Sequence, residues 1–225
     1  MNTSVVTPEL RARVRGLAMP IALAFGRVGL TPNALTVIGF GIAALAGVAA
    51  SQGAWALAGF LVIFGGVFDL FDGALARATN RVSRLGGFLD SVFDRWGEGL
   101  VYVGIVWGTL VLGHERPAVL SAVALTSSFM VSYTRAKSES LGFTPGTGMA
   151  NVGLAPREVR IVILTAGLLL AGILPGAADG GRGTPPSVVA LEVALGLIAA
   201  LATIATLQRI LHVVRQPQPT SEENA

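Results

Sequence analysis

The fold is decided by residues 69–94, which read DLFDGALARATNRVSRLGGFLDSVFD. This stretch holds four of the five aspartates of a 225-residue chain. Asp69 and Asp72 lie at the end of one apolar stretch, and Asp90 and Asp94 lie near the start of the next. An ionisable side chain at the centre of a membrane helix costs about 2.5–3.5 kcal/mol, and less near the helix ends. Four carboxylates in this position therefore call for a compensating cation.

The composition of the whole chain is typical of a membrane protein. Hydrophobic residues make up 52% and charged residues 13%, and the mean hydropathy is +0.68, whereas soluble domains average about 25% charged residues. There is no cysteine, so disulfides and thiolate chemistry are excluded. Six stretches approach or exceed the roughly 20 apolar residues that a spanning helix needs, at residues 32–51, 54–74, 86–113, 117–141, 157–175 and 187–213. The sequence therefore predicts an all-α integral membrane protein with six transmembrane helices.

The basic residues predict the orientation of these spans. With six spans both termini lie on one side, and that side receives fourteen of the sixteen basic residues. They are Arg11, Arg13, Arg15, Arg27, Arg77, Arg81, Arg84, Arg95, Arg135, Lys137, Arg157, Arg160, Arg209 and Arg215. Cytoplasmic loops carry such an excess, so we expect a multi-pass protein of the cell membrane with cytoplasmic termini. These residues border apolar spans, which argues against a nucleic-acid surface.

The two ends of the chain differ from the spans. Residues 1–27 mix apolar residues with arginines and predict an amphipathic helix on the membrane surface; a short soluble helix is the alternative. Residues 1–215 show no internal repeat and are expected to form a single membrane-embedded domain. The polar residues 216–225 predict a disordered tail.

The spacing of the aspartates predicts a metal site. Asp69 and Asp72 are three residues apart, and Asp90 and Asp94 are four apart, so each pair shares one face of a helix. The two spans follow each other and are expected to be antiparallel neighbours whose acidic ends meet at the cytoplasmic side. Carboxylate ligands without nearby His or Cys favour Mg²⁺ or Mn²⁺ over zinc. The alternative is simple pairing of the carboxylates with nearby arginines, namely Arg77, Arg81, Arg84 and Arg95.

The same run resembles the signature of the CDP-alcohol phosphotransferase family. It reads Asp69-x2-Asp72-Gly73-x2-Ala76-Arg77-x8-Gly86-x3-Asp90-x3-Asp94, with eight fixed positions over twenty-six residues. The resemblance covers most of the chain, including the helix entry Thr31-Pro32-Asn33-Ala34-Leu35-Thr36. It implies an enzyme that transfers a phosphatidyl group from CDP-diacylglycerol to an alcohol, releases CMP and forms a homodimer in the membrane lipid.

The resemblance also implies a role for each matching residue. Asp69, Asp72 and Asp90 would hold two divalent ions, Mg²⁺ or Mn²⁺, and Asp94 would complete the second site and act as the general base. The CDP moiety would bind at Gly73, Ala76, Arg77 and Gly86, with Arg77 against the diphosphate.

The acceptor is predicted from basic residues beyond the signature. They are Arg135, Lys137, Arg157, Arg160 and Arg209, all on the cytoplasmic side. Arginine binds phosphate through a bidentate fork, so these residues favour an acceptor that already carries a phosphate. The arrangement looks like that of phosphatidylinositol phosphate synthases, which implies inositol phosphate. Glycerol phosphate would need similar charges and is the alternative, as is plain membrane anchoring of the basic residues.

Two further alternatives remain open. Glu98 lies one turn beyond Asp94, where it either supports the site or pairs with Arg95. An ion-coupled transporter could also use intramembrane aspartates, although the broken helices and repeats typical of transporters are not visible in this sequence.

Overall fold

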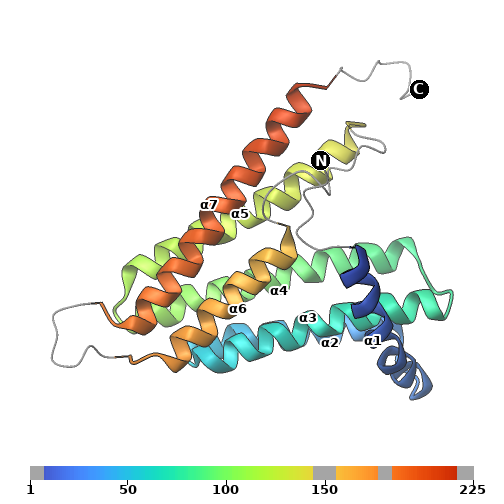
Figure 1. Ribbon diagram of the computed structural model, residues 1–225, viewed down its shortest axis with the longest axis horizontal. Helices are drawn as coiled ribbons and strands as arrows, with labels where there is room; N and C mark the ends of the chain where they lie inside the picture. Colours follow the sequence, from blue (N-terminus) through green and yellow to red (C-terminus); the bar gives the residue numbers. More distant parts are fainter. Residues whose placement is uncertain (1–7, 144–155, 177–183, 217–225) are drawn as a thin grey trace.

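The computed structural model describes residues 8–143, 156–176 and 184–216, with side chains from Gly16 onward. Within these ranges every regular element is a helix, as predicted (Figure 1). The helices are α1 (Pro8–Arg27), α2 (Pro32–Ser51), α3 (Trp55–Ala78), α4 (Arg84–Val111), α5 (Glu115–Ser140), α6 (Arg157–Ile173) and α7 (Pro186–Val214). The predicted disordered tail lies outside the described residues apart from Gln216, and so does the start of the chain up to residue 7.

Local capping fixes where the helices of the acidic region begin. Thr31 caps α2, its hydroxyl accepting a hydrogen bond from the backbone N–H of Ala34 at 3.2 Å, and Pro32 is the first helical residue. Ser83 caps α4 in the same way and accepts from the N–H of Gly86 at 3.0 Å. These caps place the acidic end of α4 directly after a short turn from α3.

Four of the helices, α2, α3, α5 and α7, are long and apolar enough to cross a membrane. Helices α4 and α6 also match predicted spans, but they differ from these four in charge or in length. Helix α4 has 28 residues, but its first half carries both acidic and basic side chains, and α6 has 17 residues.

The six helices after α1 pack as a ring. Helix α2 lies between α3 and α4, α6 packs against α3 and α7, and α5 packs against α4 and α7. The expectation that the two acidic helices pack directly against each other is therefore wrong, because α2 separates them. Helix α1 packs on α3 through the buried Ala18 and Ala22. Figure 1 shows α5 and α7 side by side, diverging from the α2–α4 layer toward their carboxyl ends.

Glycines allow α2 to approach α4 closely. A Cβ atom added at Gly104 would lie 2.1 Å from the carbonyl oxygen of Gly47, and one added at Gly108 would lie 2.2 Å from that of Ala50. Small residues at such crossings are the usual means by which membrane helices gain van der Waals contact. This crossing lies toward the carboxyl end of α2 and brings α2 close to α4.

Candidate active site

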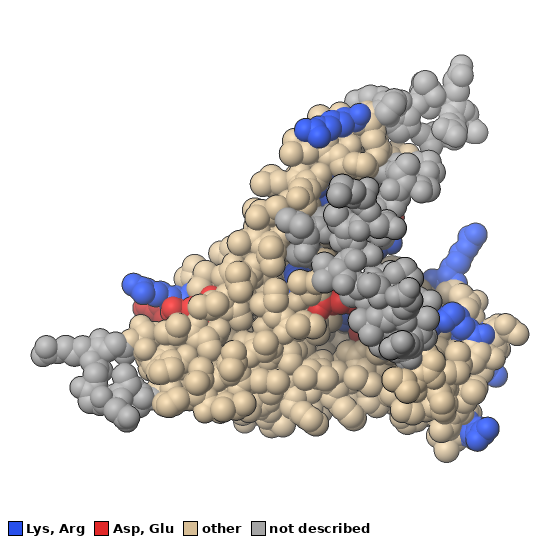
Figure 2. Space-filling view, viewed as in Figure 1, with Lys and Arg blue, Asp and Glu red and all other residues tan. Residues whose placement is uncertain are grey.

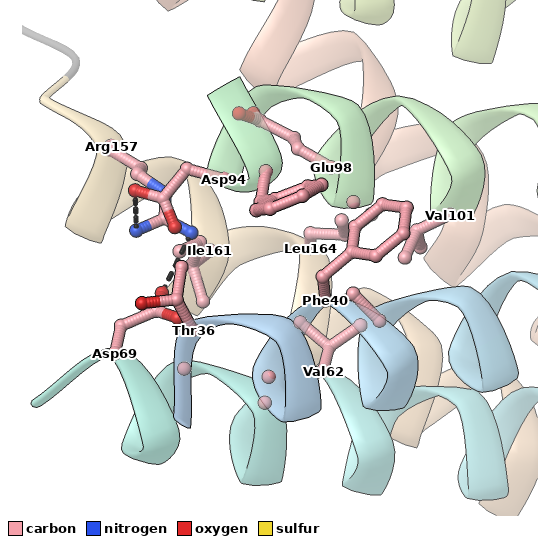
Figure 3. Close-up of a pocket in the computed structure, with 16 residues that line it drawn as sticks. Thr36, Phe40, Val62, Asp69, Asp94, Glu98, Val101, Arg157, Ile161 and Leu164 are labelled. Carbon is pink, nitrogen blue, oxygen red and sulfur yellow. Dashed lines mark ion pairs between the residues drawn. The ribbon is translucent and has the colours of Figure 1, made fainter. Parts of the chain in front are cut away.

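Two of the aspartates converge on one arginine. The Nη2 atom of Arg157 lies 2.9 Å from Oδ2 of Asp69, and its Nη1 atom lies 2.7 Å from Oδ2 of Asp94 (Figure 3). Asp69 comes from α3, Asp94 from α4, and Arg157 is the first residue of α6. One guanidinium group therefore joins two consecutive helices, α3 and α4, to the distant α6.

Asp72 is held by a different partner. Its carboxylate is buried, with the residue 6% exposed, and its Oδ2 accepts a hydrogen bond of 2.7 Å from the hydroxyl of Thr36. Thr36 lies on α2, little more than one turn after the Thr31 cap. The sequence predicts Thr36 only as part of a helix start, because nothing in the local pattern shows which face of α2 meets α3. Asp90 is half-buried on α4, one turn before Asp94.

A cavity opens beside these carboxylates, between α2, α3, α4 and α6 (Figure 3). Its volume is about 50 Å³, which is room for a few water molecules or small ions. Asp69, Asp94 and Arg157 line its polar end, while Phe40 and Val101 line the apolar part. The cavity is thus continuous from a charged end to an apolar interior.

Glu98, which lines the cavity, forms a second ion-pair network. It contacts Arg95 on its own helix and Arg160 on α6, with 3.3 Å between Oε1 and the Nε of Arg160. Arg160 is only 2% exposed, and a buried cation of this kind requires a carboxylate partner. The predicted pairing of Glu98 with Arg95 is confirmed. Glu98 also lines the cavity, and its support of the site stays a prediction.

The donor chemistry fits a divalent cation, although the side chains do not form a closed ligand set in this conformation. Four carboxylates without a neighbouring His or Cys are the hard oxygen donors that Mg²⁺ and Mn²⁺ accept. No group of three acidic, His or Cys side chains comes together closely enough to hold an ion within the described parts of the chain. Instead, Arg157 supplies the positive charge between Asp69 and Asp94.

The predicted CDP residues lie around the carboxylates and not in the cavity. Gly73 and Ala76 are half-buried on α3, and the exposed Arg77 folds back so that a Cβ on Gly73 would lie 3.3 Å from its Nη1. A Cβ on Gly86 would lie 3.3 Å from Oδ1 of Asn33 at the start of α2. These small residues leave backbone accessible next to the acidic ends of the helices.

The predicted acceptor residues are distributed over three helices. Arg157 lines the cavity, and Arg160 is buried against Glu98. Arg209 on α7 donates to the carbonyl of Val131 on α5. On the exposed end of α5, Arg135 pairs with Glu139 at 2.9 Å and Lys137 is exposed. In this conformation Arg157 pairs with Asp69 and Asp94 and lines the cavity, whereas Arg160 pairs with Glu98 in the cavity wall.

Comparison with known proteins connects this geometry to an enzyme family. A model of the CDP-alcohol phosphatidyltransferase family matches residues 29–214. The archaetidylinositol phosphate synthase of Pyrococcus horikoshii is 33% identical over 90% of this chain and 93% of its own length. The phosphatidylinositol phosphate synthase of Mycobacterium tuberculosis is 32% identical over 91% of this chain and 88% of its own length.

Solved structures give the same correspondence in three dimensions. The M. tuberculosis phosphatidylinositol phosphate synthase in complex with manganese and citrate superposes with a TM-score of 0.76 and 29% identity, covering 89% of this chain and 90% of the other. The same enzyme with CDP-DAG bound gives a TM-score of 0.74 and 28% identity, covering 89% of this chain and 94% of the other.

Proposed function

Because the chain belongs to the CDP-alcohol phosphatidyltransferase family, we propose that it transfers a phosphatidyl group from CDP-diacylglycerol to inositol phosphate and releases CMP. The observation that carries this proposal is the match, over about nine-tenths of the chain, to synthases of inositol phosphate lipids. The bound CDP-DAG in one of the matching structures supports the donor. The acidic and basic groups at the cavity supply the chemistry that such a transfer needs.

Asp94 is the proposed general base. Its side chain is 15% exposed at the polar end of the cavity, where a bound hydroxyl group could reach it. The acceptor hydroxyl attacks the phosphorus atom that carries the diacylglycerol, the bond from this phosphorus to the CMP oxygen breaks, and the hydroxyl proton passes to the Asp94 carboxylate. Replacement of this carboxylate by an amide removes the proton acceptor while it keeps the shape.

Asp69, Asp72, Asp90 and Asp94 are the proposed ligands of two divalent ions, Mg²⁺ or Mn²⁺. When bound, such ions neutralise the diphosphate and stabilise the departing CMP. Manganese in the matching M. tuberculosis structure supports a divalent metal. Thr36 would keep the buried Asp72 carboxylate oriented through its 2.7 Å hydrogen bond.

The remaining residues would bind the two substrates. The half-buried Gly73, Ala76 and Gly86 leave space for the nucleotide against the backbone, and the exposed Arg77 would contact its diphosphate. The acceptor's phosphate would bind to Arg157 at the cavity, with support from the more distant basic residues, namely Arg135, Lys137, Arg160 and Arg209. Arginine suits this task because its fork matches two phosphate oxygens.

We also propose that residues 1–215 form a single membrane domain with six spans and cytoplasmic termini. The amphipathic α1 would lie at the membrane surface. In Figure 2 the flank formed by α2 and α3 is covered by uncharged residues between its two ends, and large apolar side chains such as Val37, Leu45 and Phe60 are exposed on these helices. This surface would face lipid or the second subunit of a homodimer.

The decisive experiment is CMP release by the purified protein with CDP-diacylglycerol and Mg²⁺. Inositol phosphate and glycerol phosphate are offered separately, and Asp94→Asn serves as the control. Release with inositol phosphate alone, abolished in the variant, is the expected result. CMP release with glycerol phosphate alone would show that glycerol phosphate is the acceptor. No CMP release with either compound would reject a phosphorylated acceptor, and inositol, serine and ion transport would then be tested.

A further inference from the structure

Arg157 is engaged with groups that the proposed reaction needs for another purpose. Its guanidinium binds Asp69 and Asp94, two of the four proposed metal ligands. The same guanidinium lines the cavity and is the proposed first contact of the acceptor's phosphate. We infer that Arg157 couples metal binding to acceptor binding: it holds the two carboxylates until a divalent ion takes them, and it is then released to bind the phosphate. This inference rests on the proposed function.

A divalent ion on the same carboxylates would repel the guanidinium of Arg157. Mg²⁺ binds oxygen at about 2.0–2.1 Å, and the guanidinium nitrogens lie 2.7 Å and 2.9 Å from the two carboxylates. An ion on the same oxygens would therefore lie at most about 5 Å from the nearest guanidinium nitrogen. Like charges at such a distance repel strongly in a site of low dielectric, so binding of the ion favours departure of Arg157.

Arg157 also occupies a position that is unfavourable without the carboxylates. It is the first residue of α6, and the amino end of a helix disfavours positive charge. Its Nε atom is buried without a hydrogen-bond partner among the described residues. The carboxylates of α3 and α4 offset the unfavourable charge through Nη1 and Nη2 but leave Nε without a partner. A phosphate, with three acceptor oxygens, could offset the charge and also accept from Nε.

The other arginines near the cavity form no ion pair with the proposed metal ligands among the described residues. Arg95 and Arg160 both pair with Glu98, which is outside the proposed ligand set. Among the ion pairs of the described residues, only those of Arg157 use the proposed metal ligands. The coupling is therefore assigned to one side chain and can be tested by changing it alone.

The test measures the Kd for Mn²⁺ of the purified protein by electron paramagnetic resonance, without substrates and without turnover. Arg157→Gln should bind Mn²⁺ about tenfold more tightly than the wild type, a coupling within the usual range. Arg157→Lys keeps the charge but cannot bridge two carboxylates, so it should also bind more tightly. Arg84→Gln, which removes an exposed charge from the start of α4, is the matched control and should leave the Kd unchanged. If Arg157→Lys binds Mn²⁺ like the wild type, the inference is overturned.

Addition of inositol phosphate to the same titration tests the second half of the inference. In the wild type it should tighten Mn²⁺ binding, because the phosphate draws Arg157 away from the carboxylates, and linkage makes this effect reciprocal. In Arg157→Gln this tightening should be lost; if it persists, the phosphate acts on the metal directly and the coupling is refuted. Asp90→Asn separates the two levels of failure. If Asp90→Asn binds Mn²⁺ as tightly as the wild type, the proposed metal site is rejected. If Asp90→Asn weakens Mn²⁺ binding but the Arg157 variants leave it unchanged, only the coupling is rejected.

Discussion

Replacement of Thr36 by valine should reduce activity without disturbing the shape of the site. Valine has nearly the same size as threonine, so the change removes one hydroxyl group and leaves no cavity. That hydroxyl donates the 2.7 Å hydrogen bond to the Asp72 carboxylate. Because Asp72 is 6% exposed, water has little access to replace the lost donor. The variant therefore isolates the contribution of a single hydrogen bond to the orientation of one proposed metal ligand.

The size of the effect follows from the chemistry of this bond. A hydrogen bond to a charged group contributes about 1.5–3 kcal/mol, and each 1.36 kcal/mol corresponds to a tenfold change in rate. If the whole contribution is used to position Asp72, CMP release falls by about 10- to 160-fold. The concentration of Mn²⁺ needed for half-maximal activity should rise in the same variant, since Asp72 is a proposed ligand.

The assay compares Thr36→Val with Thr36→Ser, which keeps the hydroxyl and loses only a methyl group. CMP release and the thermal unfolding midpoint in detergent are measured for both variants. Serine should retain most of the wild-type activity, so that the loss in valine can be assigned to the hydrogen bond. Activity of Thr36→Val within twofold of the wild type would show that Thr36 does not orient Asp72, and a large loss in both variants would point to packing instead.

Three further predictions concern the packing, the buried charges and the metal. Gly104→Ala would place a Cβ atom 2.1 Å from the carbonyl oxygen of Gly47, so we expect a destabilisation of about 1–3 kcal/mol, measured as a lower thermal unfolding midpoint. Gly196→Ala is the control, because a Cβ atom there meets nothing within 4 Å. Equal midpoints for the two variants would contradict the close crossing. Glu98→Ala removes a carboxylate from Arg160, which is 2% exposed, and should cost about 3–5 kcal/mol; a wild-type midpoint would show that the pair is not important. Chelation of divalent ions should abolish CMP release and Mn²⁺ should restore it, so activity that survives in EDTA would reject the metal ligands.

Local sequence signals predict the helices well because their physical causes are local. Thr31 and Pro32 define the start of α2 through a cap and a fixed backbone angle, and the structure confirms this start. The arrangement of the helices around each other is different, because it depends on contacts between distant residues. The position of α2 between α3 and α4 depends on Gly47 meeting Gly104, and neither glycine differs locally from the other glycines of the chain. Direct packing of consecutive helices was the simplest expectation, and it is wrong here.

In the candidate site, too, the local features can be predicted from the sequence and the contacts between distant residues cannot. The spacing of Asp69 from Asp72, and of Asp90 from Asp94, predicts an acidic face at the end of each of two helices. In the structure Asp69 and Asp94 line the same cavity. Their contact with Arg157 could not be predicted, because charge patterns show on which side of the membrane a basic residue lies and not which acid it meets. Arg160 illustrates this limit: no local pattern shows that it lies buried against Glu98, 62 residues away in sequence.

The residues that violate local rules of stability are those that the fold brings together. A cation at the amino end of a helix, as in Arg157, and carboxylates within apolar helices, as in Asp69 and Asp94, are each unfavourable alone. In the described conformation Arg157 pairs with both carboxylates and compensates part of their charge. A sequence that served only to stabilise the fold would replace all three by apolar residues, since well-packed hydrophobic groups are often as stable as a buried ion pair. Their presence in one place is therefore best explained by the charges that the substrates and the metal bring to the site.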